Sequence, residues 1–260
     1  MSDYENIKLE RDGVIAIVSF NRPETLNAIE GGIRREILAV INEVNADDSI
    51  RVVILTGEGR AFCAGADLTE KQPDGFDVED MLNTEYKVPL MAITNAPKPW
   101  ISAVNGAAAG VGSAFAMNCD LTVMAENAYL YQAFAAISLI PDGGATWHLT
   151  RTLGKKKAYE LIALGEKLPA QSCLELGLCN RVAPAEQLLD AAKALAMELA
   201  GKAPLSLRYA KETVNGAMSE SVDQTISHEA RLQKICMHSE DAREGTLAFL
   251  QKRAPQFKGC

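Results

Sequence analysis

The chain has 260 residues, of which 48% are hydrophobic and 23% charged, an ordinary composition for a soluble globular protein. This excludes disordered, collagen-like and low-complexity scaffolds, and the formal net charge of −8 argues against a general nucleic-acid binder, which is usually basic. At roughly 150 residues per domain, the length allows one large domain or two small ones.

Strand and helix patterns alternate through the first half of the chain. Runs rich in Val and Ile predict strands at 14–20, 51–56, 100–104 and 120–124. Apolar residues at helical spacing predict helices at 32–44, 77–95 and 110–117. Pro89 is expected to kink or break the second of these helices. The alternation favours an α/β core with mostly parallel strands.

The second half changes character beyond about residue 154, where the pattern is nearly all helical. The clearest helices are predicted at 186–199, 204–218, 221–236 and 241–250. We therefore expect an α/β core over residues 1–195 and a helical region over 196–260. The helical region has its own apolar faces, which could fold back on the core or meet another subunit.

Several features bear on location and on metals. The uncharged stretch from Pro99 to Cys119 contains serine, asparagine and glycine, which favours a strand, a turn and a buried helix over a membrane span. The six cysteines form no CxxC pair, and the polar start of the chain lacks the pattern of a secretory signal. We expect a cytoplasmic protein with reduced thiols, no membrane partner and no bound metal.

Two glycine-rich segments follow predicted strands, at 56–68 and 104–113. Neither matches the GxGxxG or P-loop patterns, so a nucleotide site of those types is unsupported. They can be read as tight strand-to-helix turns. They can also be read as backbone that exposes N–H groups to an oxyanion, helped in the second case by the positive end of a helix dipole.

Short motifs in this order and spacing resemble the crotonase (enoyl-CoA hydratase/isomerase) superfamily. They are Asn21-Arg-Pro, Leu26-Asn-Ala28, Val53-Ile-Leu-Thr-Gly57, Phe62-Cys-Ala-Gly-Ala-Asp-Leu68, Lys98-Pro, Ala103-Val-Asn-Gly106 and Cys119-Asp120. The resemblance implies a crotonase-like ββα spiral core with a helical C-terminal trimerisation region, and a homotrimer or hexamer. It also implies an acyl-CoA substrate, so that coenzyme A is part of the substrate and no separate cofactor is expected.

By motif position, the resemblance assigns the backbone N–H groups of Ala66 and Val111 to the thioester oxygen. Removing a proton beside a thioester puts negative charge on that oxygen, and losing one such donor typically costs about 10²–10³ in rate. Val111 stands where the family usually has glycine, and we expect it to narrow the pocket near the thioester. Contacts with the coenzyme A moiety are carried over to Ala64, Ala66, Asp67, Leu68, Val111, Lys252 and Phe257, and Lys252 could reach the phosphates across a subunit interface.

The acid and base residues depart from the hydratase pattern. The two positions where hydratases of the family carry glutamates are occupied here by Ala114 and Phe134. The segment Leu139-Ile-Pro-Asp-Gly-Gly144, followed by Trp147, resembles the 1,2-epoxyphenylacetyl-CoA isomerases, whose base is an aspartate. That resemblance gives the role to Asp142. The alternative is that Asp142 caps a helix beginning at residue 143.

These assignments favour an enzyme that shifts a double bond in an enoyl-CoA, with Asp142 both removing and returning the proton. Three alternatives stay open: a hydratase with Glu85 as a substitute acid, a ring-epoxide acyl-CoA isomerase, and a catalytically silent acyl-CoA-binding protein. Cys63 and His148 are expected to be packed side chains without a catalytic role.

Overall fold

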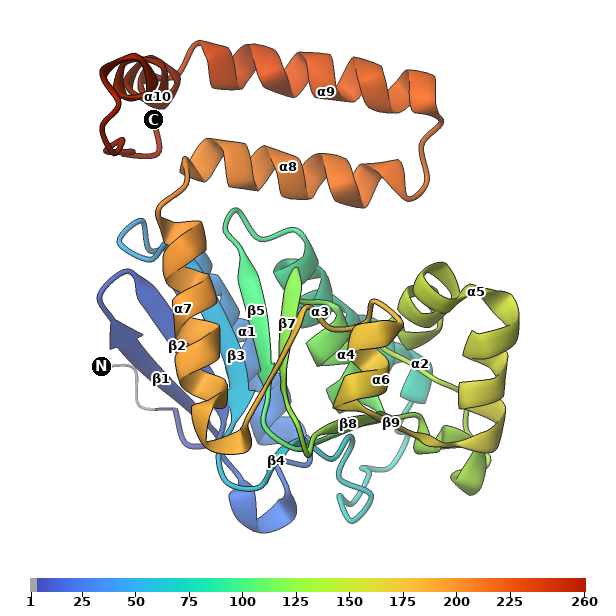
Figure 1. Ribbon diagram of the computed structural model, residues 1–260. Helices are drawn as coiled ribbons and strands as arrows, with labels where there is room; N and C mark the ends of the chain where they lie inside the picture. Colours follow the sequence, from blue (N-terminus) through green and yellow to red (C-terminus); the bar gives the residue numbers. More distant parts are fainter. Residues whose placement is uncertain (1–3) are drawn as a thin grey trace.

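The computed structural model describes residues 4–260 and is built on a six-stranded sheet (Figure 1). The strand order is β1–β2–β3–β5–β7–β10, and only the β1–β2 pair is antiparallel. The strands are β1 (Ile7–Asp12), β2 (Ile15–Phe20), β3 (Val52–Gly57), β5 (Trp100–Val104), β7 (Leu121–Ala125) and β10 (Arg181–Ala183). β2 and β5 are buried throughout, as expected of central parallel strands covered on both faces. The predicted mostly parallel α/β core is therefore confirmed.

A smaller sheet has the order β4–β6–β8–β9. Its strands are β4 (Ala61–Cys63), β6 (Ala107–Ala109), β8 (Tyr129–Tyr131) and β9 (Lys167–Pro169), and only the β8–β9 pair is antiparallel. β4, β6 and β8 each follow a strand of the large sheet and precede a helix, which gives the repeated ββα unit that the resemblance implied. The sequence reading missed these strands because three-residue segments are too short to show an alternating pattern.

The helices of the core pack their apolar residues against the large sheet. α1 (Gly31–Ala46) begins at Glu30, whose carboxylate accepts a hydrogen bond from the Ile33 N–H, and α4 (Val111–Met117) is buried along its whole length. α7 (Leu188–Ala200) contacts β3 and β5. The boundary expected at residue 195 lies inside α7, where Leu195 and Ala196 are both buried.

The helix predicted at 77–95 is interrupted in the turn before Pro89. It consists of α2 (Val78–Met81), a π-helical turn η2 (Leu82–Tyr86) and α3 (Lys87–Thr94). Pro89 lies in the first turn of α3, and it has no N–H to donate to the carbonyl groups of the π-helical turn. The expected irregularity is therefore found, one turn ahead of the proline.

The chain beyond residue 154 is mostly helical but also contributes β9 and β10, which the sequence reading did not expect. α5 (Ala145–Leu164) is kinked at Gly154, where φ is 74° and ψ is 163°. The shorter helices are α6 (Ala170–Glu175) and the 3₁₀ turns η1 (Pro23–Thr25), η3 (Ala133–Ile137) and η4 (Ala185–Gln187).

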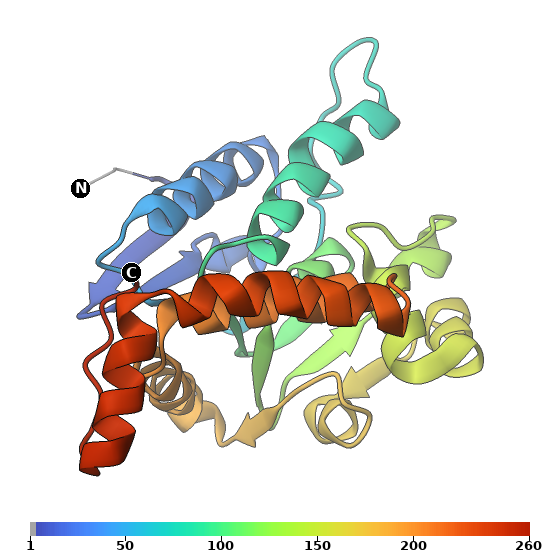
Figure 2. The same cartoon turned by 90° about the horizontal axis from the view of Figure 1, so that it is seen from above.

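The last three helices form an arm that projects from the core (Figures 1 and 2). They are α8 (Pro204–Ala217), α9 (Val222–Met237) and α10 (Glu240–Gln251), and α8 and α9 pack against each other as an antiparallel pair. Two side chains of α8 hold the arm on the core. Lys211 Nζ lies 2.8 Å from the Ile93 carbonyl oxygen and 2.8 Å from Asp120 Oδ2, and Asn215 Nδ2 donates to the Thr94 carbonyl.

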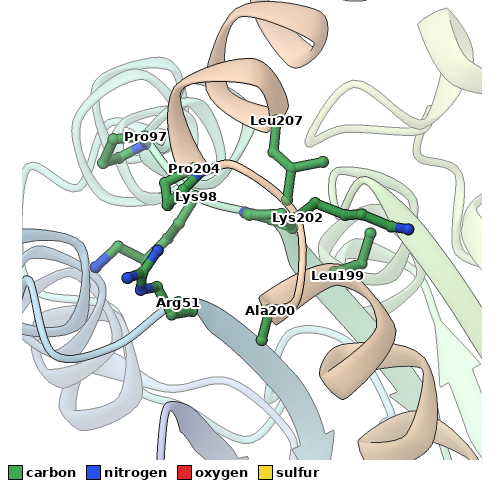
Figure 3. Close-up of a pocket in the computed structure, with 9 residues that line it drawn as sticks. Arg51, Pro97, Lys98, Leu199, Ala200, Lys202, Pro204 and Leu207 are labelled. Atoms are coloured by element: carbon green, nitrogen blue, oxygen red, sulfur yellow. The ribbon is translucent and has the colours of Figure 1, made fainter. Parts of the chain in front are cut away.

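A cavity of about 10 Å³ lies where the arm leaves the core (Figure 3). Its walls include Arg51, Lys98 and Pro204, so it opens at the amino ends of β3 and β5. The glycine-rich segments predicted to bind an oxyanion follow the carboxyl ends of those strands, and the cavity is separate from them. Within residues 4–260, no helix is both long and apolar enough to span a membrane.

Candidate active site

The two glycine-rich segments lie side by side because the short strands before them pair in parallel. Ala61 of β4 is paired with Ala107 of β6, and Cys63 with Ala108. Just beyond these strands, a Cβ placed on Gly65 would lie 3.0 Å from the Ala109 carbonyl oxygen and 3.7 Å from the Gly110 Cα. Glycine at 65, with φ of 100°, is therefore what allows the two segments to approach each other.

The N–H group of Ala66 is directed by a single parallel bridge to Ile29. The Ile29 N–H donates to the Gly65 carbonyl at 2.8 Å, and the Asp67 N–H donates to the Ile29 carbonyl at 2.9 Å. In this pattern the peptide groups on either side of Ala66 serve Ile29, so the N–H of Ala66 itself points away from it.

The N–H group of Val111 is available for a different reason. Val111 is the first residue of α4, and the N–H groups of a first helical turn have no intrahelical acceptor. Gly110 precedes it with φ of 53° and ψ of −131°, a conformation that favours glycine. The structure therefore places the two predicted N–H donors on adjacent segments, each free of the regular backbone pairing around it.

Asp142 lies in the turn that leads into α5. Gly143 and Gly144 follow it with φ of 59° and 85°, and α5 begins at Ala145. The Ala145 N–H donates to the backbone carbonyl of Asp142 at 3.0 Å, and no side chain caps the helix. The expectation that the Asp142 carboxyl caps a helix at residue 143 is therefore wrong.

The Asp142 carboxyl is desolvated instead of being paired. Its Oδ1 is buried and has no hydrogen-bond partner within residues 4–260. Burial disfavours the charged form and raises the pKa of Asp142 from 3.8 to about 6. A carboxyl with that pKa is mostly ionised near neutral pH and is a stronger base than an exposed aspartate, which suits proton abstraction.

The Asp142 turn packs directly against α4. A Cβ on Gly143 would lie 2.6 Å from the Ala114 Cβ and 3.4 Å from the Val111 Cγ2. Asn118 of α4 holds the same turn by donating from Nδ2 to the Gly143 carbonyl at 3.1 Å. The carboxyl of Asp142 is thereby held next to the helix that carries the Val111 N–H, while the Val111 side chain packs against the turn.

The two positions where hydratases of the family carry glutamates, 114 and 134, are occupied by buried apolar residues. Ala114 is fully buried, and its Cβ lies 2.6 Å from the position that a Cβ on Gly143 would take. Phe134 is 7% exposed, and its ring Cζ lies 3.6 Å from the position of a Cβ on Gly110. The carboxyl group that the structure brings to this place is that of Asp142.

Three other sequence candidates take part in packing or surface contacts. The Glu85 carboxylate accepts from the Arg34 Nε and is 44% exposed, so it belongs to a surface ion pair. Burial lowers the pKa of His148 to about 4, which keeps its ring neutral. Burial raises the pKa of the Cys63 thiol to about 12, so Cys63 is the small buried thiol that was expected.

The candidate contacts for the coenzyme A moiety fall into two groups. Ala64, Asp67 and Leu68 belong to the first glycine-rich segment; the Asp67 carboxylate accepts from the Arg22 Nη1 at 3.3 Å, and Leu68 is 72% exposed. Lys252 ends α10, and the Phe257 ring lies beside Gly245 of the same helix while its carbonyl accepts from the Arg51 Nη2, just before β3. Within one chain, the structure does not bring these two residues to Asp142.

Sequence reasoning missed one residue near Asp142. Tyr86 ends the π-helical turn, is 2% exposed, and its hydroxyl has no hydrogen-bond partner within residues 4–260. Burial is the main cause that raises the pKa of Tyr86 to about 12, and the Asp142 carboxylate contributes to the rise. No local signal could have singled it out, because an aromatic residue in an apolar helix normally indicates core packing.

Comparison with known proteins agrees with this architecture. The sequence pattern of the enoyl-CoA hydratase/isomerase family matches residues 10–260. A probable enoyl-CoA hydratase of Rhodobacter capsulatus is 36% identical over 98% of this chain and 99% of its own length. The 1,2-epoxyphenylacetyl-CoA isomerase of Escherichia coli is 37% identical over 94% and 95%, respectively. The crystal structure of an enoyl-CoA hydratase from Bacillus anthracis superposes with a TM-score of 0.92 at 31% identity, covering 98% of this chain and all of the other.

These matches cover nearly the whole chain at more than 30% identity. The chain belongs to the enoyl-CoA hydratase/isomerase family and has the crotonase fold with its helical C-terminal region. It is an acyl-CoA enzyme of that family.

Proposed function

We propose that the protein isomerises an enoyl-CoA by shifting its double bond, with Asp142 as the single acid–base group. The observation that carries this proposal is the Asp142 carboxyl, whose Oδ1 is buried without a hydrogen-bond partner among residues 4–260, on a turn that packs against the helix beginning at Val111. The absence of carboxylates at 114 and 134 supports it, because one group that removes and returns a proton needs no second acid.

The proposed reaction conserves all atoms of the substrate. Asp142 removes a proton from C2 of a 3-enoyl-CoA, and the electron pair forms a dienolate whose negative charge lies on the thioester oxygen. The N–H groups of Ala66 and Val111 stabilise that oxygen. Protonated Asp142 then returns the proton to C4, which leaves the conjugated 2-enoyl-CoA and regenerates the carboxylate. The buried apolar side chains of Val111 and Phe134 disfavour entry of water, which would add to the product.

The same proposal assigns residues to the coenzyme A moiety of the substrate. The first glycine-rich segment, with Ala64, Asp67 and Leu68, meets the coenzyme A moiety, which belongs to the substrate. Lys252 and Phe257 lie too far along the arm to serve the same chain. They reach the coenzyme A of a neighbouring subunit in a homotrimer or in a hexamer of two trimers.

Ring-epoxide isomerisation is the second candidate, and one observation favours it. The relative from Escherichia coli named 1,2-epoxyphenylacetyl-CoA isomerase is 37% identical over 94% of this chain. Hydration is the third, because most of the similar curated proteins are named hydratases. It would need an acid other than Glu85, whose half-exposed carboxylate is held in an ion pair with the buried Arg34.

The test measures proton exchange and product together. The purified protein is incubated in D₂O with a 3-enoyl-CoA and, in parallel, with the matching 2-enoyl-CoA. We expect conversion of the first to the 2-enoyl form and no 3-hydroxyacyl-CoA. Deuterium should enter C2 and C4 to the extent that protonated Asp142 exchanges with D₂O before it returns the proton. Asp142→Asn should lower the rate by about 10²–10⁴, as loss of a general base does. Asp74→Asn, at an exposed loop position, is the matched control and should leave it unchanged.

Each other result points to a different activity. Formation of 3-hydroxyacyl-CoA would identify a hydratase. Tight binding of acyl-CoA esters without exchange at C2 would identify a binding protein. Normal exchange in Asp142→Asn would show that another group is the base.

A further inference from the structure

The Tyr86 hydroxyl is a buried donor without an acceptor. The side chain is 2% exposed, and no atom within residues 4–260 accepts a hydrogen bond from its Oη. Buried tyrosine hydroxyls usually find a partner, because leaving one unpaired is unfavourable. An unpaired hydroxyl inside a family enzyme therefore needs an explanation in terms of what it meets during function.

The helix that follows Tyr86 directs it toward the Asp142 turn. Leu90 lies four residues later, on the same face of the helical segment. Its Cδ1 is 3.1 Å from the position of a Cβ on Gly143, the residue after Asp142. The face of this segment that carries Tyr86 therefore packs against the turn that carries the proposed base.

Asp142 presents the complementary atom. Its Oδ1 is a buried acceptor without a donor, just as the Tyr86 Oη is a buried donor without an acceptor. The Asp142 carboxylate contributes to the raised pKa of Tyr86, and no hydrogen bond joins the two side chains in this conformation. A hydrogen bond between them, direct or through one water, would satisfy both atoms at once.

The other groups around Tyr86 and Asp142 are ion-paired, neutral or apolar. Arg34 lies on the ring of Tyr86, with its Cζ 5.7 Å from the ring centroid, and its guanidinium is paired with Glu70 and Glu85. The guanidinium also acts on the Tyr86 hydroxyl and opposes the rise in its pKa, but arginine only donates, so the hydroxyl proton is left for an acceptor. Cys63 is a buried neutral thiol, and His148 of α5 is a neutral ring. The residues of α4 that touch the turn, Val111 and Ala114, are apolar.

We propose that Tyr86 is a positioning residue whose hydroxyl donates a hydrogen bond to the Asp142 carboxylate, directly or through one water, and holds it in the orientation for proton transfer. The catalytic part of this inference rests on the proposed function of Asp142. The proposed hydrogen bond between Tyr86 and Asp142 does not depend on that function. Because the pKa of Tyr86 is raised, its hydroxyl stays protonated at neutral pH and acts as a donor and not as a base.

The decisive experiment titrates Asp142 directly. Aspartate carboxyl carbons are labelled with ¹³C, and the Asp142 resonance is identified by its absence in Asp142→Asn. A lost donor hydrogen bond disfavours the carboxylate, so Tyr86→Phe should raise the titration midpoint by about one pH unit. Tyr159→Phe, at a 71% exposed tyrosine, should leave it unchanged. An unchanged midpoint in Tyr86→Phe overturns the inference.

Two further readouts separate positioning from a purely structural role. Because Tyr86→Phe removes a donor to the ionised carboxylate only, its melting temperature should fall at about pH 7.5, where Asp142 is charged, and not at about pH 4, whereas loss of a structural hydrogen bond would lower it at both. The plateau rate of C2 exchange should fall about 3- to 10-fold with KM unchanged, and the pH profile should move to higher pH. A lower melting temperature with an unmoved pH profile overturns the inference.

A measurement on the unmutated side chain covers the case in which Tyr86→Phe does not fold. With ¹³C at the tyrosine ζ carbons, the Tyr86 signal should shift with the Asp142 midpoint in the wild type and stay flat in Asp142→Asn. A flat signal in both overturns the inference. If Asp142→Asn still exchanges protons, the proposed function fails while these titrations remain readable. If it does not, and Tyr86→Phe titrates like the wild type, only the role of Tyr86 fails.

Discussion

A Cβ on Gly143 would lie only 2.6 Å from the Cβ of Ala114. Only a residue without a side chain therefore fits at 143 while the turn that carries Asp142 lies against Ala114 of α4. A side chain at 143 would have to displace either the turn or α4, and would move the Asp142 carboxyl with it.

Gly143→Ala should damage both stability and activity. The substitution adds a methyl group against Ala114 at a residue with φ of 59°. We expect about 1–3 kcal/mol less stability by urea unfolding, and a fall in C2 exchange because the turn that carries Asp142 must move. Gly13→Ala is the control, since Gly13 has φ of 58° and nothing within 4 Å of its Cβ position. Equal losses in the two variants would attribute the effect to backbone strain alone.

Asp142→Asn should stabilise the folded protein, and more strongly at higher pH. The folded pKa is about 6 and the ordinary value is 3.8, so the native state binds the proton more tightly than the unfolded state. The wild type therefore loses stability as the pH rises from about 4 to about 6, whereas the asparagine variant does not titrate at this position. Thermal unfolding at pH 4 and pH 7.5 should show the variant's advantage growing to at most about 3 kcal/mol. An advantage that does not change with pH would contradict the burial of this carboxyl.

Lys211→Met should loosen the attachment of the arm. The Lys211 side chain is 8% exposed, and its removal leaves the Asp120 carboxylate, which is 22% exposed and also accepts from the Trp100 N–H, without its cation. We expect a loss of about 1–2 kcal/mol in unfolding free energy, together with faster amide hydrogen exchange in α8. Lys157→Met is the matched control, because the Lys157–Glu160 pair is exposed and should contribute little. Slow exchange in α8 of the Lys211 variant would show that other contacts hold the arm.

The strands and helices predicted from local patterns are confirmed where the patterned segment is long. The strand over 100–104 was placed at its observed bounds, and the helix over 32–44 lies within α1. The apolar segments concerned span several turns or a whole buried strand, so their spacing is informative. The second sheet was not predicted, because each of its strands has three residues and is specified by pairing with distant segments.

The residues of the candidate site also fall into two groups, those that the sequence identifies and those that only the folded chain brings together. Ala66, Val111 and Asp142 were identified from motifs, because glycine-rich turns and the residues beside them leave a local trace in the sequence. An aspartate before two glycines is compatible with both a base and a helix cap, so the local sequence does not decide between them. The structure shows that within residues 4–260 no side chain caps α5. The neighbourhood of Tyr86 and Asp142 also arises only when α3 packs on that turn, because contacts between distant segments follow from the folded core and not from the order of residues along the chain.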